Sequence, residues 1–319
     1  MPTATERGHE RRTGFLPTAK RTIKEFSEDN STDWAAAMTY YALLALFPAL
    51  IALVSIIGFF FDPEQVTSAL TKVISSIGPS SAVDTFKGPI ESVTSNKGAS
   101  GIIGIVGIVL ALSSASSYVG AFMRASNIAY EVDEGRPIYK LRPLQMLVTL
   151  VLLILLTIGA VSVVLTGPIA EAVGDAVGLG STAVTVWNIA KWPVLVLIFA
   201  LMISILYYAG PNAKLRGFKF ITAGSAFATI VWIIASALFA FYVANFGSYN
   251  KTYGTLGGVV VFLVWIWLTN SVLLLGNQMN AERERSKEID AGVAGAEREI
   301  KLGERDAAKP GKRPKTAGA

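Results

Sequence analysis

The chain has 319 residues, of which 52% are hydrophobic and only 16% are charged, and its formal net charge at pH 7 is +5. Because soluble domains carry about a quarter charged residues, this composition excludes an ordinary soluble protein and predicts a membrane protein. Cysteine is absent and the one histidine is His9, which excludes disulfides, iron–sulfur clusters and a zinc site built from thiolate and imidazole ligands.

Residues 1–39 form a predicted N-terminal tail that is largely polar. In its segment "KRTIKEF", Ile23 and Phe26 lie beside Lys20 and Lys24. Apolar and basic side chains at this spacing favour an amphipathic helix on a membrane surface.

Six stretches are long and apolar enough to cross a bilayer, which takes about twenty such residues per helix. None of them contains Asp, Glu, Lys, Arg or His, and they cover residues 40–61, 101–123, 143–167, 192–209, 220–243 and 254–279. The predicted fold class is therefore all-α, a polytopic bundle of six transmembrane helices that occupies residues 40–280.

The loop at 62–100 has amphipathic character. Val66, Leu70, Val73 and Ile77 recur at helical spacing, so they share one helix face. Two interpretations stay open: the loop helices cap the transmembrane bundle, or they lie at the outer lipid interface.

The distribution of Lys and Arg predicts the orientation. The N-terminal tail and the segments 124–142, 210–219 and 280–319 hold 6, 4, 3 and 10 of them, whereas 62–100, 168–186 and 244–253 hold 3, none and 1. The positive-inside rule then places both termini in the cytoplasm. The tail at 281–319 is charged and ends in "AAKPGKRPKTAGA", which predicts partial disorder and either contact with anionic lipid or a solubilising role.

Charge-free spans constrain the chemistry. Coupled transport through a titrating group and intramembrane hydrolysis by paired carboxylates both need ionisable side chains that these spans lack. The serines of "LSSASSYVG" have no His or Lys base within the spans, so they are interpreted as packing residues. No cofactor, metal or catalytic residue is predicted.

The remaining polar residues cluster. Arg124, Asn127 and Tyr130 follow each other at steps of three, and Asn270 lies seven residues before Asn277, which predicts shared helix faces. These amides are either hydrogen-bond partners between helices or the lining of a cavity, and both readings stay open.

Four segments taken in order resemble one family: "AAAMTYYALLALFPALIAL", "ASNIAYEVDEGRPIYKLRP", "YYAGPNAKLRGFKFITAGSAFATIVWIIASALFAFYV" and "YGTLGGVVVFLVWIWLTNSVLLLGNQMNAE". Over about residues 20–285 the chain resembles the YihY/BrkB family of bacterial inner-membrane proteins. The resemblance implies a multi-pass protein of the inner (plasma) membrane with six helices and both termini in the cytoplasm. Members have carried the labels ribonuclease BN, serum-resistance factor and virulence factor.

The resemblance and the polar pattern together single out candidate residues for translocation or packing: Tyr40, Pro48, Arg124, Asn127, Arg136, Pro211, Tyr253, Asn270, Asn277 and Gln278. By motif position alone, Gly276 and Asn280 join the family-like residues.

Three functions follow as hypotheses. The first is a non-enzymatic protein that serves envelope integrity or moves lipid or another amphipathic solute. The second is a structural scaffold that recruits partners, and the third is a ribonuclease, which the lack of a ligand cluster opposes. The expected partners are membrane lipids and a periplasmic or envelope protein, without specific nucleic acid; the oligomeric state is left open.

Overall fold

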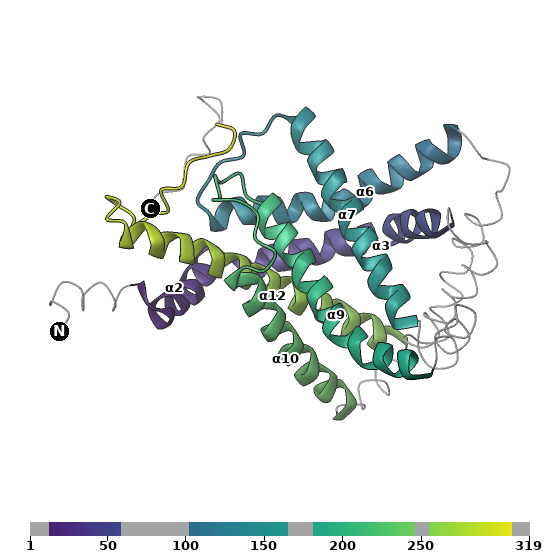
Figure 1. The fold of residues 1–319 in the computed structure, drawn as a ribbon. Helices are drawn as coiled ribbons and strands as arrows, with labels where there is room; N and C mark the ends of the chain where they lie inside the picture. The colour runs from purple at the N-terminus through teal and green to yellow at the C-terminus, as the bar shows by residue number, and fades with distance from the viewer. Residues whose placement is uncertain (1–12, 59–101, 165–180, 246–254, 308–319) are drawn as a thin grey trace. The chain divides into compact units, whose positions relative to one another are not determined.

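A computed structural model of the chain describes residues 13–58, 102–164, 181–245 and 255–307 (Figure 1). Regular structure in these ranges is helical, and the β pairing within them is one isolated bridge between Ala213 and Glu304. The helices are α2 (Phe15–Glu28), α3 (Ser31–Gly58), α6 (Ile102–Ala129), α7 (Ile138–Val164), α9 (Ser181–Ala209), α10 (Ala223–Asn245) and α12 (Thr255–Asp290). The predicted all-α class is confirmed for the described residues.

Four helices of the described ranges are long and apolar enough to cross a membrane. They are Ile138–Gly159, Thr185–Ala209, Ala223–Val243 and Gly258–Asp290, which match the last four predicted spans. The first two predicted spans fall on α3 and α6. The full set of six spans and the orientation stay predictions, and the loop at 62–100 and Tyr253 lie outside the described residues.

The chain divides into two compact units. One consists of residues 1–42, 118–144 and 200–319, and is called the polar unit below; the other consists of residues 43–117 and 145–199. In the second unit the hydroxyl groups of α7 bond within their own helix: Thr149, Thr157 and Ser162 donate to carbonyl oxygens four residues earlier at 2.7–2.8 Å. Such bonds satisfy hydroxyls in an apolar helix.

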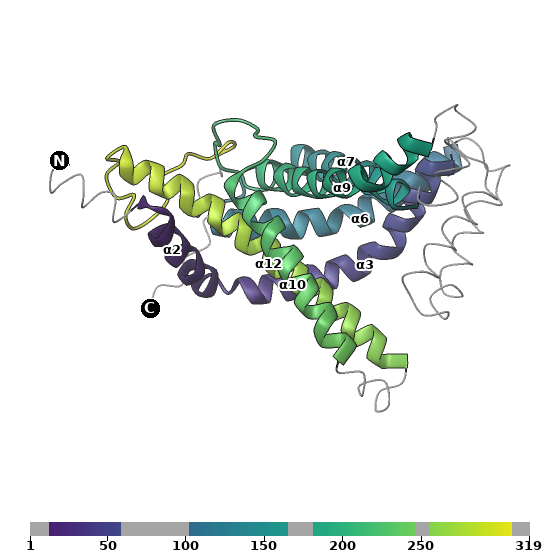
Figure 2. The same ribbon diagram turned by 60° about the horizontal axis from the view of Figure 1, so that its bottom comes forward.

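In the polar unit, α10 and α12 run side by side (Figures 1 and 2). Small residues allow this approach. A methyl group on Gly276 would lie 2.4 Å from the Tyr207 hydroxyl and 2.6 Å from Ala228 Cβ. Tyr207 on α9 also donates to the carbonyl of Leu273 at 2.6 Å, so α9, α10 and α12 meet at this level.

The segment predicted as an amphipathic N-terminal helix contains α2, which packs on α12 (Figure 2), while its place on a membrane surface stays a prediction. Its contact face is formed by threonines: Thr18 shares a hydrogen bond of 3.0 Å with Ser286, and Thr22 contacts the sulfur of Met279 at 3.4 Å. Beside this contact face α2 exposes Phe15, Leu16 and Ile23, each about two thirds accessible to solvent.

Three helix ends require left-handed backbone. Asn30 (φ 49°) separates α2 from α3, Glu131 (φ 53°) follows α6, and Gly292 (φ 71°) follows α12. After α6, the N–H of Glu131 bonds to Ile128 and that of Val132 bonds to Asn127, the pairing of a Schellman motif. Glutamate is uncommon in this conformation, and its carboxylate has partners that hold it there, as described below.

Candidate functional site

Three stretches of apolar helix end close to one loop of the polar unit. α9 ends at Ala209, α10 begins at Ala223, and the uncharged part of α12 ends shortly before Glu282. The loop 210–222 connects α9 to α10 at this boundary, so its side chains belong where a membrane span would meet water.

A buried arginine organises the start of this loop. Arg136 holds both carboxylate oxygens of Glu134 at 2.6–2.7 Å and donates to the carbonyls of Ala209 (3.2 Å) and Gly210 (2.9 Å). Burial alone would raise the pKa of Glu134, but the hydrogen bonds and charge of Arg136 lower it below its usual value. Arg136 thereby ties the segment after α6 to the end of α9.

Asn127 extends this network. Its amide nitrogen donates to Glu134 at 3.0 Å, and its oxygen accepts the backbone N–H of Asn212 at 2.7 Å. The Asn212 side chain donates to the carbonyls of Asp133 and Asp306, both at 2.8 Å. Pro211 is buried next to it. Three of the predicted residues, Asn127, Arg136 and Pro211, thus lie together and shape a loop.

The segment after α12 crosses this loop. Arg305 donates to the carbonyls of Ala213 (2.8 Å) and Tyr208 (2.7 Å), and its guanidinium lies 4.7 Å from the centre of the Tyr208 ring. Lys214 donates its N–H to Gly303 at 2.7 Å. Residues 303–306 therefore hold the beginning of the loop in place.

A second charged cluster surrounds Arg285 on α12, with its side chain only 3% exposed. It pairs with Glu25 and Glu282, both at 3.1 Å, and with Glu131. Glu131 also accepts the N–H of Ile300 at 3.0 Å, which explains how its left-handed backbone is held. Burial raises the pKa of Glu131, against the opposing charge of Arg285.

Asp29 lies beside this cluster. Burial, reinforced by the charges of Glu25 and Glu131, raises the pKa of Asp29 to about 6, although Arg285 and a hydrogen bond from Gln278 oppose the shift. The predicted residue Gln278 is 2% exposed, and its Oε1 has no hydrogen-bond partner among the described residues.

The two predicted amides of α12 differ in their surroundings. Asn270 donates to Thr39 at 3.1 Å and accepts from Tyr118 at 2.8 Å, so it links α12 to α3 and α6. Asn277 is fully buried, and neither of its amide atoms has a hydrogen-bond partner within the described ranges. This contrast favours a packing role for Asn270 and leaves a lining role for Asn277 as a proposal.

Tyr40, Arg124 and Pro48 lie apart from these networks. Tyr40 is 60% exposed, and its ring meets that of Tyr41 edge-on at 5.6 Å. Arg124 is exposed, with its guanidinium 5.5 Å from the centre of the Tyr41 ring. Pro48 lies inside α3, in the other compact unit.

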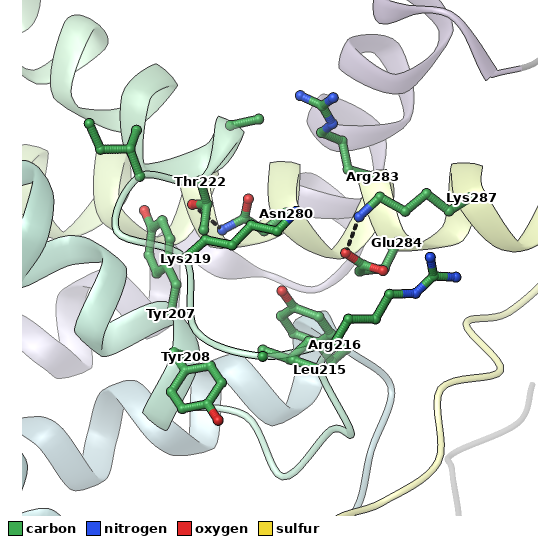
Figure 3. A pocket seen from close by; sticks show the side chains of 14 residues that line it. Tyr207, Tyr208, Leu215, Arg216, Lys219, Thr222, Asn280, Arg283, Glu284 and Lys287 are labelled. Atoms are coloured by element: carbon green, nitrogen blue, oxygen red, sulfur yellow. Dashed lines mark hydrogen bonds and ion pairs between the residues drawn. The ribbon is translucent and has the colours of Figure 1, made fainter.

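A pocket of about 200 Å³ opens between the loop 210–222 and α12 (Figure 3). It is called the basic pocket here, because four of its lining residues are basic and one is acidic. The charged residues are Arg216, Lys219, Arg283, Glu284 and Lys287, and the other lining residues include Tyr130, Tyr207, Tyr208, Thr222 and Asn280. Glu284 pairs with Lys287. Arg216, Lys219 and Arg283 have no ion pair with any described residue.

Asn280 fixes one wall of the basic pocket. Its oxygen accepts the N–H of Gly224 at 2.8 Å, and its nitrogen donates to Thr222 at 3.0 Å (Figure 3). Thr222 and Ser225 in turn cap the start of α10 reciprocally, with N–H to hydroxyl distances of 2.8 and 3.0 Å. The wall is therefore held by several hydrogen bonds, while Arg216, Lys219 and Arg283 around it are exposed.

Apolar side chains flank the basic pocket. Phe218, Phe220 and Ile221 are each about half exposed, in the same loop that supplies Arg216 and Lys219. Sequence reasoning missed this pocket, although "KLRGFKF" carries a signal: basic and aromatic residues alternate directly after a span.

Comparison with known proteins identifies the family. The family described as "Virulence factor BrkB" matches residues 22–300. The ribonuclease-like protein YfkH of Bacillus subtilis (strain 168) is 32% identical over 255 residues, which cover 80% of this chain and 90% of that protein. A UPF0761 membrane protein of Aggregatibacter aphrophilus (strain NJ8700) is 26% identical over 259 residues, covering 81% and 88%. One of Vibrio campbellii (strain ATCC BAA-1116) is 28% identical over 276 residues, covering 82% and 81%.

No solved structure matches the chain. The family match spans most of the sequence and agrees with the resemblance of its four ordered segments. The chain belongs to the BrkB family of membrane proteins.

Proposed function

We propose that this protein is a non-enzymatic protein of the bacterial inner membrane that binds the anionic headgroup of a lipid or other amphipathic solute in the basic pocket. In this role it moves that solute across the membrane or maintains the integrity of the cell envelope. The observation that carries the proposal is the group of Arg216, Lys219 and Arg283, three basic side chains without an acidic partner among the described residues, at the end of three apolar helices.

The surroundings of the basic pocket support a membrane ligand. A soluble anion needs only the charges, but an amphiphile also needs apolar contacts at the headgroup level. The exposed side chains of Phe218, Phe220 and Ile221 offer such contacts beside Arg216 and Lys219. Aromatic and basic residues are both enriched where a protein meets the lipid interface.

The predicted orientation fits the same proposal. With both termini in the cytoplasm, the loop 210–222 lies at the cytoplasmic leaflet, whose anionic lipids attract basic residues with about 1 kcal/mol each. The cavity of about 200 Å³ suits a headgroup and not a whole lipid, so acyl chains stay outside it.

Reconstitution of the full chain in liposomes tests the proposal. A fluorescent anionic phospholipid is quenched from outside, and quenching beyond the outer-leaflet half of the signal indicates movement between leaflets. Replacing Arg216 and Lys219 by Gln together should weaken headgroup binding about thirtyfold, at about 1 kcal/mol per charge. Lys214→Gln is the matched control, because Lys214 is exposed in the same loop and lines no described pocket.

A scaffold role is the second candidate. It is favoured by Asn270, whose amide donates one hydrogen bond to α3 and accepts one from α6. A scaffold would lose function when residues 308–319 are deleted and would tolerate the double substitution in the basic pocket. The translocator should show the reverse behaviour in the same cells.

A further inference from the structure

A second pocket borders Arg283 and Lys287, two of the basic residues that line the basic pocket. It has a volume of about 190 Å³ and lies between α2 and α12. Its lining consists of Thr13, Phe15, Thr18, Met279, Arg283, Ser286, Lys287 and Asp290. Arg283 and Lys287 therefore line both cavities.

The two shared residues stand one helical turn apart on α12, so their side chains are neighbours on its surface. Figure 3 shows both rising from this helix, with Lys287 directed to Glu284. A pair of cations with a hollow on each side is suited to two anionic groups of one ligand.

The charges of the joint site agree with two anionic groups. Arg216, Lys219, Arg283 and Lys287 supply four positive charges, and Glu284 and Asp290 supply two negative ones. The difference of 4 − 2 leaves a formal charge of +2, which balances two singly charged phosphodiesters. Both pockets are lined by Arg283 and Lys287, so two separate ligands would compete for these two cations.

Each hollow also has apolar neighbours of its own. Phe15, which lines the second pocket, is 67% exposed, and Leu16 beside it is 71% exposed. Beside the basic pocket, the exposed apolar side chains are Phe218 and Phe220, which are 47% and 53% accessible to solvent. A ligand with two phosphates, each carrying its own acyl chains, matches this repetition better than a soluble diphosphate does.

We infer that the preferred ligand is a lipid with two phosphate groups joined by a short bridge, one phosphate in each hollow and the bridge over Arg283 and Lys287. This inference rests on the proposed function and deepens it by naming the lipid class. A lipid with one phosphate would use one hollow and leave a formal charge of +1 unbalanced at the joint site.

Native mass spectrometry of the detergent-solubilised full chain tests the inference. The probes are diphosphatidylglycerol with two phosphates, phosphatidylglycerol with one, and uncharged phosphatidylcholine, each titrated separately. Diphosphatidylglycerol is expected to bind about tenfold more tightly than phosphatidylglycerol. Arg283→Gln should reduce this preference to about twofold or less, since it removes a cation from both hollows.

Two further variants separate the hollows. Lys219→Gln should weaken the binding of both diphosphatidylglycerol and phosphatidylglycerol, since each of these lipids places a phosphate in the basic pocket. Arg298→Gln should change neither, because Arg298 is exposed and lines neither cavity. If Arg283→Gln lowers the melting temperature, Lys287→Gln provides the same test, because Lys287 also lines both pockets.

Three outcomes contradict the inference in different ways. Equal affinity for the two anionic lipids overturns it and leaves the proposed function standing. Binding of neither lipid above the phosphatidylcholine level overturns both. Displacement of diphosphatidylglycerol by an equal concentration of inorganic pyrophosphate would assign the joint site to a soluble ligand, and the lipid assignment would fail.

Discussion

Gly224 on α10 and Gly276 on α12 approach so closely that a methyl group on Gly224 would lie 2.2 Å from the carbonyl oxygen of Gly276. Backbone atoms cannot move aside as a flexible side chain does, so the contact requires glycine. Gly224→Ala should lower the free energy of unfolding by about 1–3 kcal/mol through overpacking. Thermal denaturation in detergent measures this loss.

Gly258 provides the matched control on α12. A Cβ atom there would meet nothing within 4 Å among the described residues, so Gly258→Ala should leave stability unchanged or raise it slightly through helix propensity. Equal melting temperatures for the Gly224 and Gly258 variants would contradict the close approach.

Asn270 and Asn277 offer a contrast within one helix. Asn270→Leu removes a donor to Thr39 and an acceptor for Tyr118, which leaves both hydroxyls without that partner. The expected cost is about 1–3 kcal/mol, visible as a lower melting temperature. Lipid movement per folded molecule should not change.

Asn277→Leu should behave differently. Since its amide has no partner among the described residues, replacing it with an apolar side chain should be neutral or stabilising. If Asn277 lines the path of a solute, lipid movement will fall while the melting temperature holds. A loss of stability equal to that of the Asn270 variant would show instead that Asn277 has a packing partner.

Asp29 predicts a specific pH dependence. Its pKa is raised to about 6, above the ordinary value of 3.8, so the folded protein binds a proton more tightly than the unfolded chain does. The contribution of this group to stability is therefore greatest below pH 4 and declines as the pH rises towards and through 6. Asp29→Asn removes that decline.

The difference between the variant and the unchanged protein isolates this group from its neighbours. At pH 7.5 Asp29→Asn should raise the free energy of unfolding by about 1 kcal/mol, after the screening that water gives a half-buried side chain. At pH 4 the two proteins should melt together. A constant difference at both pH values would assign the effect to the Gln278 hydrogen bond and not to ionisation.

Arg136 and Lys140 form ion pairs of different kinds. Arg136 is 4% exposed in its side chain and holds Glu134 and two carbonyls, so Arg136→Gln should cost about 3–5 kcal/mol. Lys140 pairs with Asp306 at 2.7 Å but is 54% exposed, so water screens this pair and Lys140→Gln should cost far less than Arg136→Gln. Chemical denaturation of both variants should separate these costs, and similar midpoints would show that Arg136 is not needed to hold the loop.

Hydropathy predicted the helices of the described chain well, because uninterrupted apolar runs have few other structures available in a membrane. The ends were less predictable. α12 continues to Asp290, beyond the predicted span at 254–279, since Glu282 and Arg285 find lateral partners on α2 and after α6. A hydropathy profile counts Glu282 and Arg285 as charged and ends the span before them, because it contains no information on their ion-pair partners.

Side-chain spacing was a weaker guide to the site. Residues three apart in a helix turn by about 300°, so Arg124, Asn127 and Tyr130 drift around α6 with each step. Asn127 and Tyr130 are buried, whereas Arg124 is exposed. The segment "KLRGFKF" indicates Arg216 and Lys219, but no local pattern tells that they come to lie beside Arg283, so the basic pocket as a whole was not predictable.

The length of α12 has a mechanical consequence. Its 36 residues form one helix from Thr255 to Asp290, which at 1.5 Å per residue is about 54 Å long, against about 30 Å for a hydrocarbon core. Asn270, Arg283 and Lys287 belong to one continuous helix, so a rotation of α12 about its axis would move all three side chains through the same angle. Arg283 and Lys287 are thus connected to Asn270 by unbroken helix.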